Sequence, residues 1–211
     1  ALPNETPTYL QPSSSIVQYR FKLHHKIPID QEALHQYQER YPEEIATVET
    51  FKTFLQHHNE QEKAHLTASA WLIKPSNHHV LLTHHKKLQK WLQLGGHMSQ
   101  HEYDTKTTAL REAKEESGIE NIICVEQTIL HLGVYYIPEI HQEPAHYHFD
   151  VCYLHYAHEP CTTVKSSESN ALKWFSCSEL CTTSQEPSIA IMARKWQLLS
   201  HNILETTDMM S

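Results

Sequence analysis

The sequence predicts an α+β fold, an α/β/α sandwich in which helices cover a mixed β-sheet, preceded by a helical N-terminal extension. Short runs rich in Trp, Leu, Ile and Val are bounded by turn residues, which indicates strands. Stretches with apolar residues at helical spacing occur between these runs, without the regular alternation of a doubly wound fold. An apolar content of 39% over 211 residues is enough for the core of one domain.

The N-terminal part is expected to be a flexible arm followed by helices. Residues 1–15 contain three Pro and three consecutive Ser without apolar periodicity, so we expect no regular structure there. A helix is expected after Asp30, a favourable N-cap, and another from Pro42, a favourable first helical residue. We therefore assign residues 16–65 to a helical extension. Its role, as a cap over the substrate cleft or as a homodimer contact, stays open.

The main domain is expected to span residues 66–205 and to contain the whole sheet. Its predicted strands cover residues 67–74, 79–85, 88–94, 122–136, 146–156 and 171–175. The first two are separated by turn residues and indicate a hairpin. Helices are expected over residues 105–117, ended by Gly118 as C-cap, and over residues 187–204. Cys177 and Cys181 are spaced as on one helix face.

Composition excludes several classes of partner. The chain has 17 Lys and Arg against 25 Asp and Glu, a net charge of −8, and no basic run, which argues against binding a nucleic-acid polymer. No apolar run approaches the roughly 18 residues of a membrane span, so we expect no membrane partner. The five cysteines are odd in number and lack paired CxxC spacing, which favours reduced thiols and a cytoplasmic location.

Three carboxylates cluster on the helix predicted over residues 105–117. Glu112, Glu115 and Glu116 are three and four positions apart, so they share one face, and Arg111 can pair with Glu115. Because adjacent anions repel, a divalent cation that prefers oxygen, above all Mg²⁺ or Mn²⁺, is the natural compensation. Such a metal polarises a phosphoryl oxygen and lowers the pKa of bound water, so the pattern indicates metal-assisted phosphoanhydride hydrolysis.

Residues 95–119, GGHMSQHEYDTKTTALREAKEESGI, resemble the box of the Nudix (MutT-like) hydrolases. That pattern is Gly, five residues, Glu, seven residues, Arg-Glu, an apolar residue, any residue, Glu-Glu, any residue, Gly and an apolar residue. Gly96 and Glu102 match the first spacing. The second half is matched by Arg111, Glu112, Ala113, Glu115, Glu116, Gly118 and Ile119. Eight residues separate Glu102 from Arg111, so either Glu102 keeps its place or Asp104 substitutes for it.

The resemblance implies a Nudix sandwich whose substrate is a small molecule, a nucleoside diphosphate linked to another group. It implies that Glu112, Glu115 and Glu116 bind Mg²⁺, with Mn²⁺ as a substitute, and that the Gly95 carbonyl is a further ligand. Arg111 would orient the glutamates. In many relatives a later acidic residue completes the site, and Glu168 is our candidate here. Either Glu112 or Glu168 would orient or deprotonate the attacking water.

Histidines are further candidates for substrate binding. In a strand, His146, His148 and Asp150 project from one face while Phe149 enters the other, and such a set binds metal or phosphate. His97 lies in the box loop, within reach of substrate phosphates. Because the chain has 19 histidines, a polar solvent-facing surface is the alternative explanation for all of these.

Two classes of function are compatible with these patterns. The first is a metal-dependent hydrolase that cleaves a diphosphate in a nucleotide-derived substrate. The second is a module that keeps the fold for nucleotide recognition or partner contact, with catalysis weakened by the extra loop residue. The three carboxylates favour the hydrolase, because a scaffold without metal has no physical reason to hold mutually repelling groups together.

Overall fold

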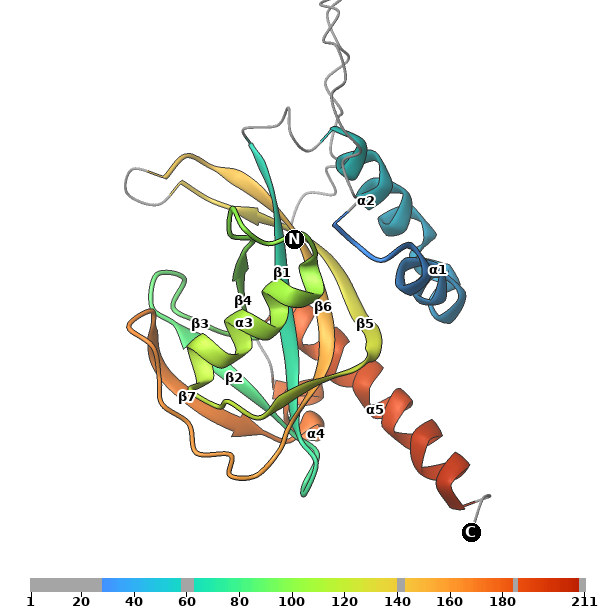
Figure 1. Ribbon diagram of the computed structural model, residues 1–211, viewed down its shortest axis with the longest axis vertical. Coiled ribbons are helices and arrows are strands. Elements are labelled where there is room, and N and C mark those ends of the chain that lie inside the picture. The colour runs from blue at the N-terminus through green and yellow to red at the C-terminus, as the bar shows by residue number, and fades with distance from the viewer. Residues whose placement is uncertain (1–27, 58–62, 140–142, 184–185, 209–211) are drawn as a thin grey trace, which may run out of the picture.

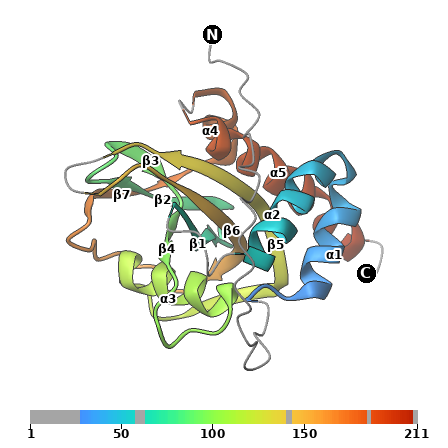
Figure 2. The same ribbon diagram turned by 90° about the horizontal axis from the view of Figure 1, so that it is seen from above.

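The structure is a computed structural model that describes residues 28–57, 63–139, 143–183 and 186–208. A mixed sheet lies between α3 (Thr105–Ser117) on one side and α4 (Cys177–Thr183) and α5 (Pro187–Asp208) on the other (Figures 1 and 2). The helices α1 (Gln31–Arg40) and α2 (Ile45–His57) pack beside the edge strand β5 (Ile122–Ile137). The predicted α+β sandwich with helices before it is therefore confirmed.

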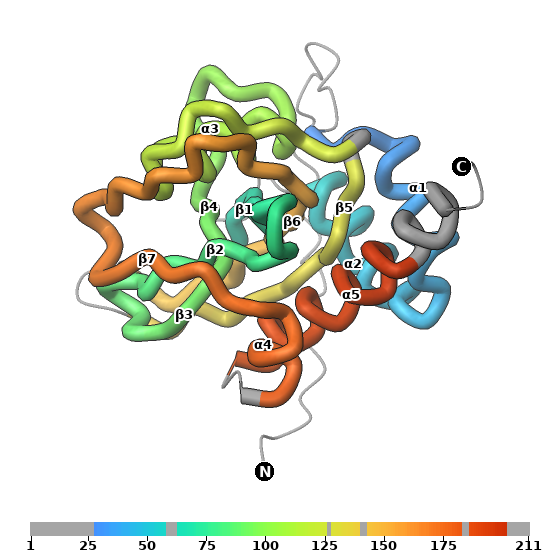
Figure 3. Tube along the Cα trace, turned by 90° about the horizontal axis from the view of Figure 1, so that it is seen from below, coloured from blue at the N-terminus to red at the C-terminus, as the bar shows by residue number. Residues whose placement is uncertain are grey.

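Seven strands form one sheet in the described part of the chain. Besides β5 they are β1 (Ala64–Lys74), β2 (His79–His85), β3 (Lys90–Leu92), β4 (Leu94–His97), β6 (His146–Ala157) and β7 (Ser169–Phe175). The order is β3-β2-β1-β6-β5, with β4 pairing with β1 and β7 with β2. The pair β1–β6 is parallel and the other pairs are antiparallel, so β1 lies at the centre of a mixed sheet (Figure 3).

Alternation along β1 assigns its side chains to the two helical layers. Leu72 packs in one apolar cluster with Ala113 of α3, whereas Trp71 packs in another with Trp196 of α5. Because successive strand residues point to opposite faces, the odd-numbered positions of β1 face away from α3. This set includes His65, Thr67 and Ser69.

The first N-terminal helix begins at its predicted start, whereas the second begins three residues later than expected. The side chain of Asp30 accepts a 2.9 Å hydrogen bond from the Glu32 N–H and caps α1. Residues 42–44 form a 3₁₀ turn, and α2 begins at Ile45 rather than at Pro42. The arm predicted for residues 1–15 lies outside the described residues, as do residues 16–27 and 58–62 of the extension assigned to residues 16–65.

The single strand predicted over residues 88–94 is wrong. Residues 86–89 form a turn in which Gln89 has a φ of 54° and donates its N–H to the His85 carbonyl at 2.8 Å. The chain then makes two short strands with different partners, because β3 pairs with β2 and β4 pairs with β1. The apolar run in the sequence conceals this change of partner.

In the part of the chain that the structure describes, no helix has the length and apolar character needed to cross a membrane.

Candidate functional site

Both ends of α3 are fixed by local interactions. The Asp104 carboxylate accepts hydrogen bonds from the N–H and the hydroxyl of Thr107, at 2.8 and 3.0 Å, and so caps the N-terminus. Gly118 has a φ of 71° and donates its N–H to the Lys114 carbonyl at 2.8 Å, an αL C-cap. The helix packs on the sheet through Ala109 and Ala113, both fully buried. These contacts fix which face of α3 is turned toward the sheet.

Arg111 connects the loop before α3 to the carboxylates on the helix. Its Nε and Nη2 donate to the two oxygens of Glu102 at 2.8 and 3.1 Å, and its Nη1 donates to Glu112 and Glu115 at 2.8 and 2.9 Å. A further bond reaches the carbonyl of His97 at 2.9 Å. One guanidinium therefore holds three carboxylates and the end of β4 in a fixed relation.

The structure places Glu102, not Asp104, against Arg111. Burial alone would raise the pKa of Glu102, but hydrogen bonds from Arg111, the Ser99 N–H and Thr108 lower it to about 2. Asp104 is engaged as the helix cap instead. The extra residue between Glu102 and Arg111 is therefore accommodated in the loop without displacing the Glu102 carboxylate.

Glu116 is the most buried of the three helix carboxylates, with 7% of its surface exposed. Its Oε2 accepts a 2.9 Å hydrogen bond from the Gly95 N–H, which would favour the charged form. Burial, reinforced by the charges of Glu112, Glu168 and Glu115, outweighs that bond and raises the pKa of Glu116 to about 8.

The remaining helix carboxylates differ in exposure. The Glu112 side chain is 15% exposed, and burial raises its pKa in spite of the Arg111 charge. Glu115 is 59% exposed and faces solvent beside Arg111. Across from the helix, a Cβ at Gly96 would lie 2.6 Å from a Glu112 oxygen, so a side chain at this position would displace the Glu112 carboxylate.

Glu168, the candidate from a later loop, is exposed and precedes β7. Its carbonyl accepts a 2.9 Å hydrogen bond from the Lys86 N–H, which joins its loop to the turn after β2. Its carboxylate lies close enough to raise the pKa of both Glu112 and Glu116. Glu168 therefore lies close enough to the helix carboxylates to influence their charge. In the described part of the chain it makes no hydrogen bond with them.

The donor set on α3 fits a hard divalent cation. Glu116 combines near-complete burial with a raised pKa, so its ionised form needs a nearby positive charge besides the Gly95 N–H. Arg111 supplies charge to Glu112 and Glu115. Carboxylate and carbonyl oxygens are the ligands that Mg²⁺ and Mn²⁺ prefer, so the residues present match such an ion.

The predicted pattern of His146, His148 and Asp150 on one face is present, with Phe149 stacked on Phe54 on the other. Asp150 is buried and accepts hydrogen bonds away from the glutamates. Its donors are the hydroxyls of Thr67 and Ser69, at 2.9 and 2.5 Å, and the Gln93 amide at 3.3 Å. Asp150 thus joins β6 to β1 within the sheet, and the structure does not bring it to the carboxylates of α3.

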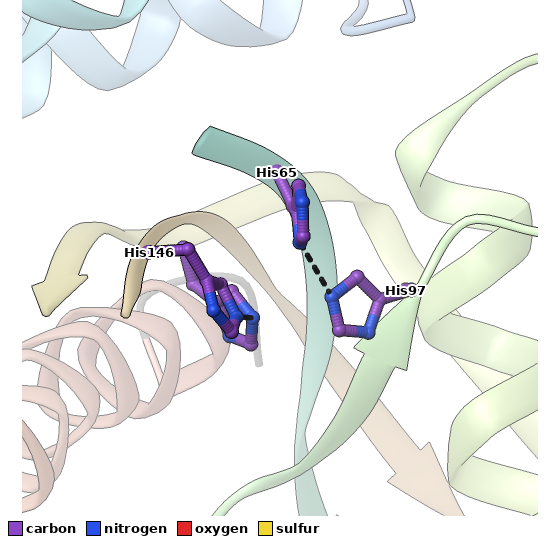
Figure 4. Close-up of side chains that lie close together, drawn as sticks. His65, His97 and His146 are labelled. Carbon is purple, nitrogen blue, oxygen red and sulfur yellow. Dashed lines mark hydrogen bonds between the residues drawn. The ribbon is translucent and has the colours of Figure 1, made fainter. Parts of the chain in front are cut away.

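His97, His146 and His148 converge with a fourth histidine, His65. Figure 4 shows the side chains of His65, His97 and His146 directed toward one another from β1, β4 and β6. His65 was missed in the sequence, because only the pairing of β1 with β6 and β4 places it beside the others. In the sequence, His65 lies just before the strand predicted over residues 67–74, whereas β1 begins at Ala64.

The chain is similar to known proteins over its main domain. A family model described as NUDIX domain matches residues 63–196. A C. elegans Ap4A hydrolase in a binary complex has 18% sequence identity and a TM-score of 0.53, with 65% of this chain and 98% of that chain covered.

Two further solved structures have comparable overlap. A hydrolase of the NUDIX family from Clostridium perfringens has 26% identity and a TM-score of 0.50, over 64% of this chain and 97% of that one. A MutT protein from Methanosarcina mazei Go1 has 17% identity and a TM-score of 0.52, over 65% and 97%. No curated protein matches the chain.

Proposed function

The chain belongs to the NUDIX family, and on that premise we propose that it is a divalent-metal-dependent hydrolase. Its substrate would be a nucleoside diphosphate linked to another group, cleaved at the phosphoanhydride bond. The observation that carries this proposal is that Glu116 and Glu112 face Gly95 and Gly96, while Arg111 joins Glu115 to Glu112. The resemblance of residues 95–119 to the Nudix box supports the same reaction.

The residues have distinct roles in this proposal. Glu112, Glu115, Glu116 and the Gly95 carbonyl hold the metal. When bound, Mg²⁺ or Mn²⁺ shields the diphosphate charge and lowers the pKa of a coordinated water. Arg111 positions the glutamates through its three carboxylate contacts. Glu112 or Glu168 orients the water that attacks phosphorus and accepts its proton.

The geometry favours turnover over a recognition module with weakened catalysis. That alternative rests on displacement of Glu102 by the extra loop residue, yet Glu102 keeps two contacts with Arg111.

We further propose a cytoplasmic protein that acts on a small molecule, without a nucleic-acid or membrane partner. The free thiols of buried Cys152 and Cys177 support a reducing compartment. A homodimer formed through the N-terminal extension is a further proposal.

Phosphorus NMR tests the proposed activity. The protein is incubated with Mg²⁺ and a pool of ADP-ribose, dinucleotide polyphosphates, nucleotide sugars, NADH and deoxynucleoside triphosphates. We expect a diphosphate resonance to be replaced by monophosphate resonances, and Glu115→Gln or Glu116→Gln to abolish the change. The matched control is Glu120→Gln, because Glu120 is 90% exposed and lies outside the carboxylate cluster. Nucleotide binding without turnover by the unmodified protein would instead support the recognition module.

A further inference from the structure

Four imidazoles from three adjacent strands meet on one face of the sheet. The Nδ1 of His65 lies 3.3 Å from the Nε2 of His97, and the Nε2 atoms of His146 and His148 lie 2.9 Å apart. One ring nitrogen of each residue falls within 4.8 Å of those of the other three. His97 is exposed and the other three are half-buried, so an ion from solvent has access to the group.

These spacings match those of ligands around a tetrahedral zinc ion. With Zn–N bonds of about 2.0–2.1 Å, two ligand nitrogens of a tetrahedron are about 3.3 Å apart. The His65–His97 separation has this value already, and the His146–His148 separation differs from it by a few tenths of an ångström. Two separations are thus near the tetrahedral value, and the ligand atoms that lie farther apart, up to 4.8 Å, would move closer together when an ion binds.

The backbone preorganises the cluster. His65 is the direct Cα partner of His148 in the parallel β1–β6 ladder, and His97 is paired with Thr67 in the β1–β4 ladder. The three strands thus hold the ligands on a rigid surface, so that little ordering is required when an ion binds.

A backbone carbonyl fixes the tautomer of His146. Its Nδ1 lies 2.8 Å from the carbonyl oxygen of Pro144, which can only accept, so Nδ1 carries the proton. In the neutral ring this leaves a lone pair on Nε2, the atom that faces His148. A metal-binding histidine commonly donates its other N–H to a carbonyl, which fixes the ring orientation.

The histidine cluster is separate from the glutamate cluster. His65 lies at an odd-numbered position of β1, on the face opposite α3, whereas the glutamates belong to α3. The donors also differ, since imidazole nitrogens favour Zn²⁺ and related ions and carboxylates favour Mg²⁺ or Mn²⁺. His97 is the connection between the two, because its backbone carbonyl accepts a hydrogen bond from Arg111.

We propose that His65, His97, His146 and His148 form a binding site for one Zn²⁺ ion. The ion clamps β4 to β1 and β6 just after Gly95 and Gly96, and so holds the strand end that contacts Arg111. This role is structural and does not depend on the proposed hydrolase activity.

Isothermal titration calorimetry with zinc chloride tests the site on the full chain, purified without a histidine tag and stripped of metal. We expect one Zn²⁺ per chain, and at least tenfold weaker binding in His65→Gln and in His148→Gln. The exposed His158 provides the matched control, so His158→Gln should bind like the unmodified protein. Glu116→Gln should also retain Zn²⁺ binding, which separates this site from the carboxylates.

Thermal unfolding supplies a second readout. Saturating Zn²⁺ should raise the Tm of the unmodified protein and of His158→Gln, but not that of His148→Gln, because only the intact site gains ligand-linked stability. Circular dichroism establishes that each variant is folded, and the exposed His97→Gln replaces any variant that is not. The proposal is overturned if the unmodified protein binds no stoichiometric Zn²⁺. Equal affinity in the cluster variants, or loss of binding in Glu116→Gln alone, would also overturn it.

Discussion

The backbone N–H of Gly95 donates a 2.9 Å hydrogen bond to the carboxylate of Glu116, joining β4 directly to α3. A Cβ at Gly95 would lie 2.5 Å from that of Ser69, so glycine at this position lets β4 lie close to β1. The contact brings the most buried carboxylate of the helix to the backbone of the glycine pair. The proposed metal site is built on this approach.

Gly96→Ala should inactivate the enzyme with little loss of stability. The new Cβ would lie 2.6 Å from a Glu112 oxygen and 2.8 Å from its Cδ, so the Glu112 carboxylate must move. We expect kcat to fall at least tenfold while the Tm changes by a few degrees at most, since a side chain can yield. Steady-state kinetics and thermal unfolding measure the two effects. An unchanged kcat would show that the position of Glu112 is not critical.

Substitutions of Glu102 and Asp104 should affect different properties, catalysis in the first case and stability in the second. Glu102→Gln weakens the contacts to Arg111, so we expect a lower kcat from misplaced glutamates. Asp104→Ala removes the cap of α3 and should cost about 1 kcal/mol of unfolding free energy, with kcat preserved. Kinetics and urea unfolding of both variants provide the comparison. The reverse pattern would mean that Asp104 has taken over the role of the box glutamate.

Lys195→Met should destabilise the protein by releasing the N-terminal helices. Lys195 of α5 is 8% exposed and donates to Glu44 at 2.6 Å and to the Tyr37 hydroxyl at 2.8 Å, which ties α5 to α1 and to the turn between α1 and α2. Removing Lys195 leaves Glu44 without its charged partner, at a cost of about 3 kcal/mol of unfolding free energy, measured by urea unfolding. The exposed pair of Lys52 with Glu49 is the control, and Lys52→Met should cost under about 1 kcal/mol. Equal effects of the two variants would contradict the anchoring role.

His131 should make stability depend on pH in the acidic range. Burial and the facing Lys195 lower its pKa from the ordinary 6.5 to about 4, although the nearby Glu44 charge opposes the change. Between pH 6.5 and 4 the unfolded chain binds a proton at His131 that the folded chain does not. Stability is therefore complete above pH 6.5 and falls as the pH drops toward 4, by roughly 3 kcal/mol from this group. His131→Gln should flatten this part of a urea-unfolding series, and an unchanged slope would refute the assignment.

The sequence was sufficient for features specified by nearby residues. The C-terminal end of α3 follows from Gly118, and its carboxylate face follows from helical spacing. The turn at Gln89 was missed because a polar residue with positive φ has no reliable sequence signal. His65 was missed because its neighbours on β4 and β6 are set by long-range strand pairing. The chemistry of local motifs could be predicted from the sequence, whereas strand order and register depend on contacts between distant residues.

Metal binding by the helix carboxylates is tested most directly by electron paramagnetic resonance with Mn²⁺. The signal of free Mn²⁺ decreases as the ion binds, so titration of unmodified protein, Glu116→Gln and Glu120→Gln compares their affinities. We expect Glu120→Gln to bind Mn²⁺ like the unmodified protein and Glu116→Gln to bind it at least tenfold more weakly. Equal Mn²⁺ affinity in all three proteins would contradict the proposal that α3 holds the catalytic metal.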